Sequence, residues 1–303
     1  MKSPRFLYQA VPNAVRGSVK AALNSVLRPV GLEINSTLKQ RIEDGRLHKL
    51  QSAGHWKTQK YAAGLAIDEK KSLRFLSDTC RPFRANYSRF PISSNGGNTG
   101  YFLKNGWFES VDAEMLYSVL RRFEPVRVVE VGSGFSTGVM RQAIDDGKLE
   151  TRITSIDPQP SRGVRSYTDE YISSLVEDVD PDRIVQSLEE GDVLFIDSSH
   201  TVKTGSDVIY LFLEILPKLK PGVLIHVHDV FFPFDYPEEW VLDGWGWNEQ
   251  YLVHAFLAYN QSFEILWPAR YMWERRHEAV IAMFPSAKGA GKVPSSLWLR
   301  KVV

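Results

Sequence analysis

Two aspartates and two histidines stand where a parallel sheet would bring them together. Asp197 and His200 follow an apolar run in the segment LFIDSSH, and His228 and Asp229 follow another in LIHVHDV. If these runs are neighbouring parallel strands, their carboxyl ends meet at one edge of the sheet, where α/β proteins bind their ligands. Two carboxylates and two imidazoles would then gather beside a bound ligand.

These four side chains allow two kinds of chemistry. In the first, Asp197, His200, His228 and Asp229 hold a divalent metal ion, which lowers the pKa of an acceptor hydroxyl. The imidazoles extend the choice of ion from Mg to Mn, Fe or Zn. In the second, His200 or His228 is a metal-free general base that a neighbouring aspartate orients. A single isolated histidine most often has a purely structural role. Two histidines and two aspartates at adjacent strand ends instead favour a functional role.

A glycine turn follows an earlier apolar run, in VVEVGSGFSTG. Gly132 and Gly134 would permit a tight strand-to-helix turn and let a ligand approach the backbone closely. Asp157 ends the next predicted strand, where a carboxylate can accept both ribose hydroxyls of a nucleotide. Thr137 occupies the third position of the dinucleotide fingerprint, where Gly or Ala is expected, and this disfavours a diphosphate ligand. Glu130, just before the turn, suits a ligand that carries a cationic group, such as an amino acid.

Alternating strands and helices must position these residues, and the sequence from residue 126 onward predicts them. Continuous apolar runs separated by helical stretches are typical of a parallel sheet covered on both faces. The expected strands are 126–131, 152–156, 171–176, 192–196, 223–227, 263–267 and 296–302, and the expected helices are 112–123, 137–146, 181–189, 205–218 and 270–283. We predict an α/β fold with a doubly wound, Rossmann-like, mostly parallel sheet and a terminal antiparallel strand. Asp112 is expected to cap the first of these helices.

The first third of the chain has a different character. Residues 1–100 are predicted to form an N-terminal helical region with a lid-like loop at 86–100, and residues 101–303 the main domain. Residues 1–32 contain five basic residues and no acidic one, with apolar residues at helical spacing. This predicts a basic amphipathic helix that ends near Pro29. Such a helix packs on its own domain or makes peripheral contact with an anionic membrane.

The overall composition excludes several classes of protein. The chain has 303 residues, of which 43% are hydrophobic and 24% charged, as in ordinary globular proteins. A net charge of +1 argues against a nucleic-acid partner. The single cysteine, Cys80, excludes an intramolecular disulfide and favours a reducing cytoplasm. The sequence contains no run of about 18 apolar residues, so we predict no transmembrane helix. We therefore expect a cytoplasmic protein, located at the inner membrane surface if its N-terminal helix binds lipid.

The motifs resemble those of class I S-adenosylmethionine-dependent methyltransferases, over roughly residues 105–303. EVGSGFST is similar to the first motif of the family and SIDP to its second-strand acid, while FIDSSH and HD are similar to a bacterial small-molecule group. The resemblance implies that S-adenosylmethionine is bound by Glu130, Gly132, Ser133, Gly134, Ser136, Thr137, Asp157, Asp178 and Asp197. By this similarity Glu130 and Gly132 lie near the methionine part and Asp157 at the ribose. Asp178, in LVEDV, would reach the adenine. Some relatives hold magnesium at equivalent strand ends, but they have a carboxylate where this chain has His228.

The reaction expected from this set is O-methylation of a small-molecule acceptor. A hydroxyl is a poor nucleophile at neutral pH and needs a base or a metal, whereas an amine needs much less help. The segment LRPVGLEI and the basic N-terminus resemble cell-envelope glycan or lipid modifiers, which implies a sugar hydroxyl or another polar small molecule as acceptor. The aromatic loop FFPFDYPEEWVLDGWGWN predicts either an acceptor pocket or a hydrophobic contact surface. Glu249, just after it, is a candidate extra ligand.

Three other functions stay open at this point. The same crevice would suit an NAD-dependent oxidoreductase, and the same fold a metal-dependent hydroxylase-like relative. A non-enzymatic alternative is a membrane-associated assembly partner with a vestigial nucleotide site. The sequence does not decide the acceptor, the metal or whether the chain forms a homo-oligomer.

Overall fold

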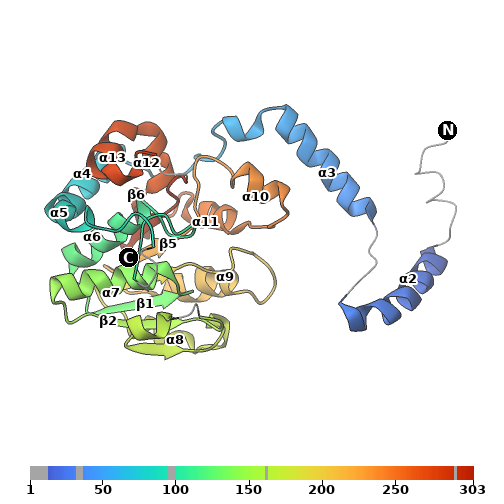
Figure 1. Cartoon of the computed structure of the whole chain (residues 1–303), viewed down its shortest axis with the longest axis horizontal. Coiled ribbons are helices and arrows are strands. Elements are labelled where there is room, and N and C mark those ends of the chain that lie inside the picture. Colours follow the sequence, from blue (N-terminus) through green and yellow to red (C-terminus); the bar gives the residue numbers. More distant parts are fainter. Residues whose placement is uncertain (1–12, 32–36, 95–99, 161–162, 290–291) are drawn as a thin grey trace. The chain divides into compact units, whose positions relative to one another are not determined.

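The computed structural model describes residues 13–31, 37–94, 100–160, 163–289 and 292–303 (Figure 1). Contacts divide the chain into two compact units, residues 1–57 and residues 58–303. In the described part of the smaller unit, α2 (Asn13–Leu27) is followed by α3 (Thr37–Ser52), with short 3-10 turns after each. The helix predicted to end near Pro29 is confirmed, since α2 ends at Leu27. No helix within the described ranges is long and apolar enough to cross a membrane.

The larger unit is built on a seven-stranded sheet with the order β3–β2–β1–β4–β5–β7–β6. The strands are β1 (Arg127–Val131), β2 (Arg152–Ile156), β3 (Glu170–Ile172), β4 (Val193–Ile196), β5 (Leu224–Val227), β6 (Phe263–Pro268) and β7 (Leu297–Lys301). Strands β1 to β5 pair in parallel, whereas β7 is antiparallel to both β5 and β6. The predicted α/β, mostly parallel, Rossmann-like fold with a terminal antiparallel strand is confirmed. The chain order reverses between β1 and β4, and ligands bind at such a switch point.

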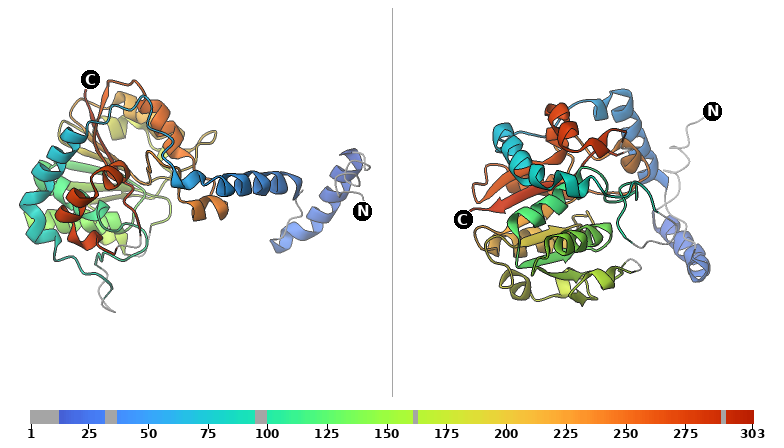
Figure 2. Two further views of the ribbon diagram at one scale, coloured as in Figure 1. Left: turned by 90° about the horizontal axis from the view of Figure 1, so that it is seen from above. Right: turned by 60° about the vertical axis from the view of Figure 1, so that its left-hand side comes forward.

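Helices cover both faces of this sheet, as Figure 2 shows. They are α4 (Glu69–Cys80), α5 (Arg84–Tyr87), α6 (Asp112–Phe123), α7 (Phe135–Gly147), α8 (Pro181–Val185), α9 (Asp207–Tyr210), α10 (Glu238–Leu242), α11 (Glu249–Leu257), α12 (Ala269–Arg275) and α13 (His277–Met283). Successive residues of β4 belong to opposite cores, because strand side chains alternate in direction. Val193 and Phe195 pack in the core with α4, α6 and α7, and Leu194 and Ile196 pack in the core with α8, α9 and α11. The apolar strand runs in the sequence reflect this two-sided burial.

Several predicted boundaries are wrong in detail. The third strand is only Glu170–Ile172, and a 3-10 turn, Val176–Asp178, takes the place of its predicted end. The helix predicted at 181–189 ends at Val185, and the one predicted at 270–283 is broken into α12 and α13 at Arg276. The helix predicted at 205–218 is α9 followed by π and 3-10 turns.

Asp112 does not cap α6. The capping residue is Val111, which makes no side-chain cap hydrogen bond. The Asp112 carboxylate instead accepts hydrogen bonds from the backbone N–H groups of Ser295 (2.9 Å) and Ser296 (3.1 Å), just before β7. A long-range partner therefore replaces the local one that the sequence pattern suggested.

Residues 58–94 belong to the larger unit in the structure. Helix α4 packs against α6 and β6, and Leu76 and Cys80 lie in the same core as α6. The predicted division into an N-terminal region, residues 1–100, and a main domain, residues 101–303, stays a prediction. Part of the predicted lid-like loop, residues 95–99, lies outside the described residues.

Buried Glu114 on α6 should make stability depend on pH. Ser110 and Ser286 donate to its Oε1, and its Oε2 has no partner among the described residues. Burial raises the pKa of Glu114 to about 7. The folded state thus holds this proton more tightly than the unfolded state. The protonated carboxyl contributes its full stabilisation when the pH is below the pKa that Glu114 has in the unfolded state. This contribution to the unfolding free energy is lost as the pH rises through the folded-state pKa of about 7.

We predict that Glu114→Gln removes this loss. The difference in unfolding free energy, variant minus wild type, should rise by on the order of 3 kcal/mol between about pH 5 and about pH 8. Urea titrations of both proteins at the two pH values measure it. Parallel pH profiles would show that Glu114 ionises normally.

Candidate active site

The glycine turn brings β1 against the end of β4. Gly132 has a left-handed backbone (φ 78°), and a Cβ atom there would lie 2.0 Å from the backbone oxygen of Asp197. Only glycine fits this contact. This contact therefore fixes the distance between the glycine turn and the first residue of the Asp/His group.

A buried carboxylate holds the turn from behind. Glu130 is fully buried and accepts hydrogen bonds from the hydroxyls of Ser136 (2.8 Å), Thr137 (2.8 Å) and Ser155 (2.6 Å). The Thr137 hydroxyl also accepts the N–H of Gly134 (3.1 Å). Burial raises the pKa of Glu130 to about 7. The structure thus places Glu130, Gly134, Ser136 and Thr137 behind the turn, and they do not contribute to the described lining of the crevice.

Gly132→Ala should be strongly destabilising, because it combines a steric overlap with an unfavourable backbone. We expect the unfolding free energy to fall by about 3 kcal/mol or more. Gly138→Ala, in α7, is the matched control. Its Cβ would make only ordinary van der Waals contacts, with the side chains of Tyr101 (3.8 Å) and Tyr167 (3.9 Å). Thermal unfolding of both variants checks this, and equal melting temperatures would refute the tight contact.

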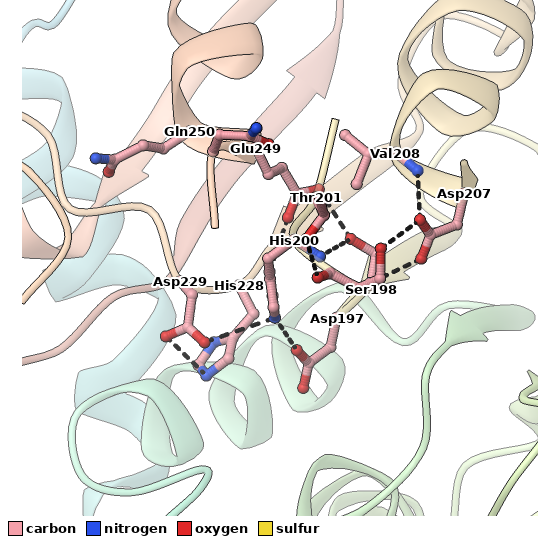
Figure 3. Close-up of polar contacts among 12 residues, drawn as sticks. Asp197, Ser198, His200, Thr201, Asp207, Val208, His228, Asp229, Glu249 and Gln250 are labelled. Carbon is pink, nitrogen blue, oxygen red and sulfur yellow. Dashed lines mark hydrogen bonds and ion pairs between the residues drawn. The ribbon is translucent and has the colours of Figure 1, made fainter. Parts of the chain in front are cut away.

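His200 lies at the centre of a carboxylate cluster (Figure 3). Its Nε2 is 3.2 Å from Asp197 Oδ1 and 3.7 Å from Asp229 Oδ2. One ligand atom from each of Asp197, His200 and Asp229 can be chosen so that all lie within 4.8 Å of one another. His200 and Asp229 both have left-handed backbones (φ 55° each), a conformation that non-glycine residues adopt rarely and mostly at functional sites.

The electrostatics of the cluster favour bound positive charge. Burial lowers the pKa of His200, but its hydrogen bonds with Asp197 and Glu249 outweigh this and hold that pKa well above its usual value. Burial would raise the pKa of Asp197, yet the nearby His228 and His200 lower it to about 2. The Asp197 carboxylate therefore stays ionised and attracts a proton or a metal ion.

His228 lies beside this cluster rather than within it. Its Nε2 is 3.8 Å from Asp229 Oδ1, and its Nδ1 has no partner among the described residues. The compact ligand set found in the described ranges does not include it. The structure thus brings all four predicted residues to one edge of the sheet, but only three of them into ligand range. His226 is buried against Phe195 and bonded to Ser296, a structural position.

Glu249, a candidate extra ligand in the sequence analysis, bonds to His200. Its Oε2 is 2.8 Å from His200 Nδ1, on the ring nitrogen that faces away from Asp197. It therefore orients the imidazole by accepting from its Nδ1–H, while Nε2 faces the cluster. Glu249 is 1% exposed, and it starts α11, 49 residues away along the chain.

A cavity of about 520 Å³ lies along the carboxyl ends of β1, β2 and β4. It is lined by residues that include Gly132, Ser133, Asp157, Asp197, His200, His228 and Asp229. Asp157 Oδ2 accepts the N–H (2.9 Å) and the hydroxyl (2.6 Å) of Ser133, which fixes the carboxylate at the mouth of the turn. The predicted ribose position of Asp157 is thus at the wall of a cavity that also exposes the Asp/His cluster.

The far end of this cavity is formed by Leu175, Val176 and Glu177. Asp178, predicted to reach the adenine, is exposed and is not part of the described lining. The short β3 and the 3-10 turn Val176–Asp178 place the preceding carboxylate, Glu177, at the cavity instead. The position of Asp178 at the adenine, which the resemblance implies, stays a prediction.

A second cavity, of about 600 Å³, meets the first one. Trp107, Asp229 and Trp247 line both cavities. Trp240 and Trp245, from the aromatic loop after β5, line only the second. The loop therefore forms part of a cavity wall next to this cluster, and its use as an acceptor pocket stays a prediction.

Comparisons with known proteins match part of the chain. Residues 129–230 match the family described as "Methyltransferase domain". An uncharacterised protein from Archaeoglobus fulgidus is 36% identical over 88 residues, which cover 26% of this chain and 39% of that protein, well short of two thirds of its length. The solved methyltransferase PaMTH1 of Podospora anserina, bound to SAH, is 14% identical over 90% of this chain and 98% of its own, with a TM-score of 0.39. A cmcI structure with Mg and SAM is 12% identical over 72% of this chain and 84% of its own, with a TM-score of 0.39.

The family match covers most of the candidate site. It runs from β1 to the end of β5 and includes the glycine turn, Asp157 and the Asp197–His200–Asp229 cluster. Glu249 and most of the tryptophan-rich loop lie beyond it. At these low identities and TM-scores, the similarities to solved structures add nothing about residues or substrates. The matched segment, about a third of the chain, is similar to a methyltransferase domain and lies on a sheet whose switch point borders the first cavity.

Proposed function

We propose that the chain methylates a hydroxyl group of a small polar acceptor such as a sugar. The observation that carries this proposal is the position of Asp197, His200 and Asp229 at the wall of the cofactor cavity. S-adenosylmethionine, when bound, would supply an electrophilic methyl group: the acceptor oxygen bonds to its carbon in line with the carbon–sulfur bond, which breaks and releases S-adenosylhomocysteine. The chain must then hold the two partners in contact and remove the hydroxyl proton.

The cofactor is proposed to lie along the first cavity. Asp157 would accept the ribose hydroxyls, since the turn already holds this carboxylate at the cavity wall. Glu177, Val176 and Leu175 would surround the adenine at the far end. This orientation directs the methionine part toward Gly132, Asp197 and the histidines, where the methyl group is needed.

The donor set of the cluster fits a divalent metal ion. Two carboxylates and one imidazole can place their ligand atoms within 4.8 Å of one another, and the second imidazole nitrogen is bonded to a carboxylate. Metal-binding histidines commonly have such a partner. An ion held by Asp197, His200 and Asp229 would lower the pKa of the acceptor hydroxyl. In a metal-free enzyme, His200 or His228 would take that proton itself.

Labelled S-adenosylmethionine and a panel of sugars and phenols test the reaction. We expect the label in an ether product, and binding of S-adenosylhomocysteine, but not of NADH, should raise the melting temperature. Stabilisation by NADH alone, or label found only in amines, would contradict the proposal. Elemental analysis of the wild type and of Asp197→Ala and Asp229→Ala decides the role of the metal. Bound Mn, Fe, Zn or Mg that is lost in both variants supports it, and full activity after chelation refutes it.

Location and partners also stay proposals. The chain is proposed to be cytoplasmic and to bind no nucleic acid, in line with its balanced charge. Helix α2 exposes Val19, Leu23 and Val26 beside Lys20, and this pattern supports peripheral contact with an anionic membrane. Cosedimentation with anionic and zwitterionic vesicles tests it. Binding to the anionic vesicles, reduced by high salt, is expected, and failure to sediment with either would contradict the contact.

A further inference from the structure

The second cavity is placed where an acceptor must lie. It joins the cofactor cavity at Trp107, Trp247 and Asp229. Asp229 is itself part of the reactive cluster, with its Oδ2 3.7 Å from His200 Nε2. A molecule in the second cavity would therefore present a group to the cluster without entering the cofactor cavity.

Indole rings form a continuous wall of this cavity. Trp240 and Trp245 stack with their centroids 4.8 Å apart and their planes 11° apart. Trp247 lies across both of them, with its centroid 5.1 Å from that of Trp240 and 4.9 Å from that of Trp245. The Trp247 ring also contacts His200, at 4.1 Å between centroids. The wall thus leads directly from the second cavity to the reactive cluster.

The polar lining of the cavity consists mainly of hydrogen-bond acceptors. Glu109, Asp112, Asp229 and Glu239 contribute carboxylates, and Lys292 is the single basic side chain of the described lining. The Lys292 ammonium donates to the backbone oxygen of Gly106 and therefore has a protein partner. Such a lining repels phosphorylated or carboxylated ligands and favours ligands with several hydroxyl donors.

The arrangement of the rings also argues against a quaternary ammonium ligand. A cation cage needs open ring faces around one point, but Trp240 and Trp245 are stacked on each other and leave no space between them. The Lys292 ammonium already lies 6.0 Å from the centroid of Trp240. A flat phenol would contact the indoles but offers few hydroxyl donors to a lining with several carboxylates.

We propose that the second cavity is the acceptor site and that it binds an uncharged glycosyl unit. This inference rests on the proposed methyltransferase reaction and names its acceptor class. The apolar C–H face of the sugar ring would lie on the Trp240–Trp245–Trp247 wall, and its hydroxyls would donate to the surrounding carboxylates. The hydroxyl to be methylated would face Asp229, which borders both cavities. A volume of about 600 Å³ is in the range of small-molecule sites.

Tryptophan fluorescence tests the proposal directly. Wild-type enzyme saturated with S-adenosylhomocysteine is titrated with uncharged methyl glycosides of hexoses and deoxyhexoses, and in parallel with choline, catechol and a hexose phosphate. We expect saturable fluorescence changes with at least one methyl glycoside and none with the hexose phosphate or choline. Saturation by catechol or choline with no glycoside response would overturn the proposal.

Two variants locate the binding site. Trp245→Ala should weaken glycoside binding by about tenfold or more, because large aromatic side chains dominate such contacts. Leu242→Ala, on the same loop and equally exposed (43% for both residues), should leave it unchanged because Leu242 does not line the cavity. S-adenosylhomocysteine binding, measured by calorimetry, should stay the same in both variants. Unchanged glycoside affinity in Trp245→Ala would overturn the assignment. Failure of the wild type to bind S-adenosylhomocysteine would instead refute the proposed function. In that case the glycoside titration, repeated on the enzyme without S-adenosylhomocysteine, still tests the acceptor site.

Discussion

His200→Ala is expected to lower kcat for methyl transfer by about 10²–10⁴-fold. The physical reason is its central position: Nε2 faces Asp197 and Asp229, and Nδ1 is held by Glu249. The loss is expected whether His200 binds a metal ion or accepts the proton. Single-turnover transfer from labelled S-adenosylmethionine measures it, with the cofactor at saturation.

Two further variants control this result. Glu249→Gln keeps the shape of the side chain but removes the charge that orients the imidazole, so a smaller loss, of about 10–100-fold, is expected. His277→Ala changes an exposed histidine on α13 and should have no effect. Affinity for S-adenosylhomocysteine should change only slightly in all three proteins. A kcat for His200→Ala close to that of the wild type would remove the cluster from the reaction.

Asp157→Ala is expected to weaken the binding of S-adenosylhomocysteine by about 10²–10⁴-fold. A carboxylate that accepts two ribose hydroxyls contributes two charge-assisted hydrogen bonds, each of which contributes about 1.5–3 kcal/mol. The variant also releases Ser133, whose N–H and hydroxyl both donate to Asp157. Isothermal titration calorimetry gives the affinity directly.

The matched control is Asp178→Ala. The resemblance places Asp178 at the adenine, but the structure leaves it exposed and outside the described cavity lining. We expect no change in affinity for Asp178→Ala and a moderate loss for Glu177→Ala. A large loss with Asp178→Ala, and none with Asp157→Ala, would show that the cofactor lies elsewhere.

Local sequence patterns predicted the parts of the fold that depend on local physics. The β4 run VLFI is apolar at every position because both of its faces are buried, and this feature is visible in sequence. The glycine turn is equally local, since Gly132 needs a left-handed backbone directly after a strand. Together with the assumption that the strands are parallel, these signals were sufficient to predict that Asp197 and Asp229 lie at one edge of the sheet.

Contacts between distant segments could not be predicted in the same way. Glu249 bonds to His200 across 49 residues, and Asp112 bonds to Ser295 across 183. Neither partner follows from spacing, because each depends on how a loop or an edge strand returns to the sheet. The position of Glu130 behind the turn is a similar case, since the three hydroxyls that bond it belong to α7 and β2. Sequence therefore identified the elements that carry the site better than the partners that orient it.

A crystal structure of the chain with S-adenosylhomocysteine is the most direct test of the cofactor site. We predict that the ribose hydroxyls lie on Asp157 and that the sulfur lies at the end of the cavity bordered by His200 and Asp229. A nucleoside bound away from the ends of β1, β2 and β4, or a sulfur directed away from this cluster, would contradict the proposed reaction.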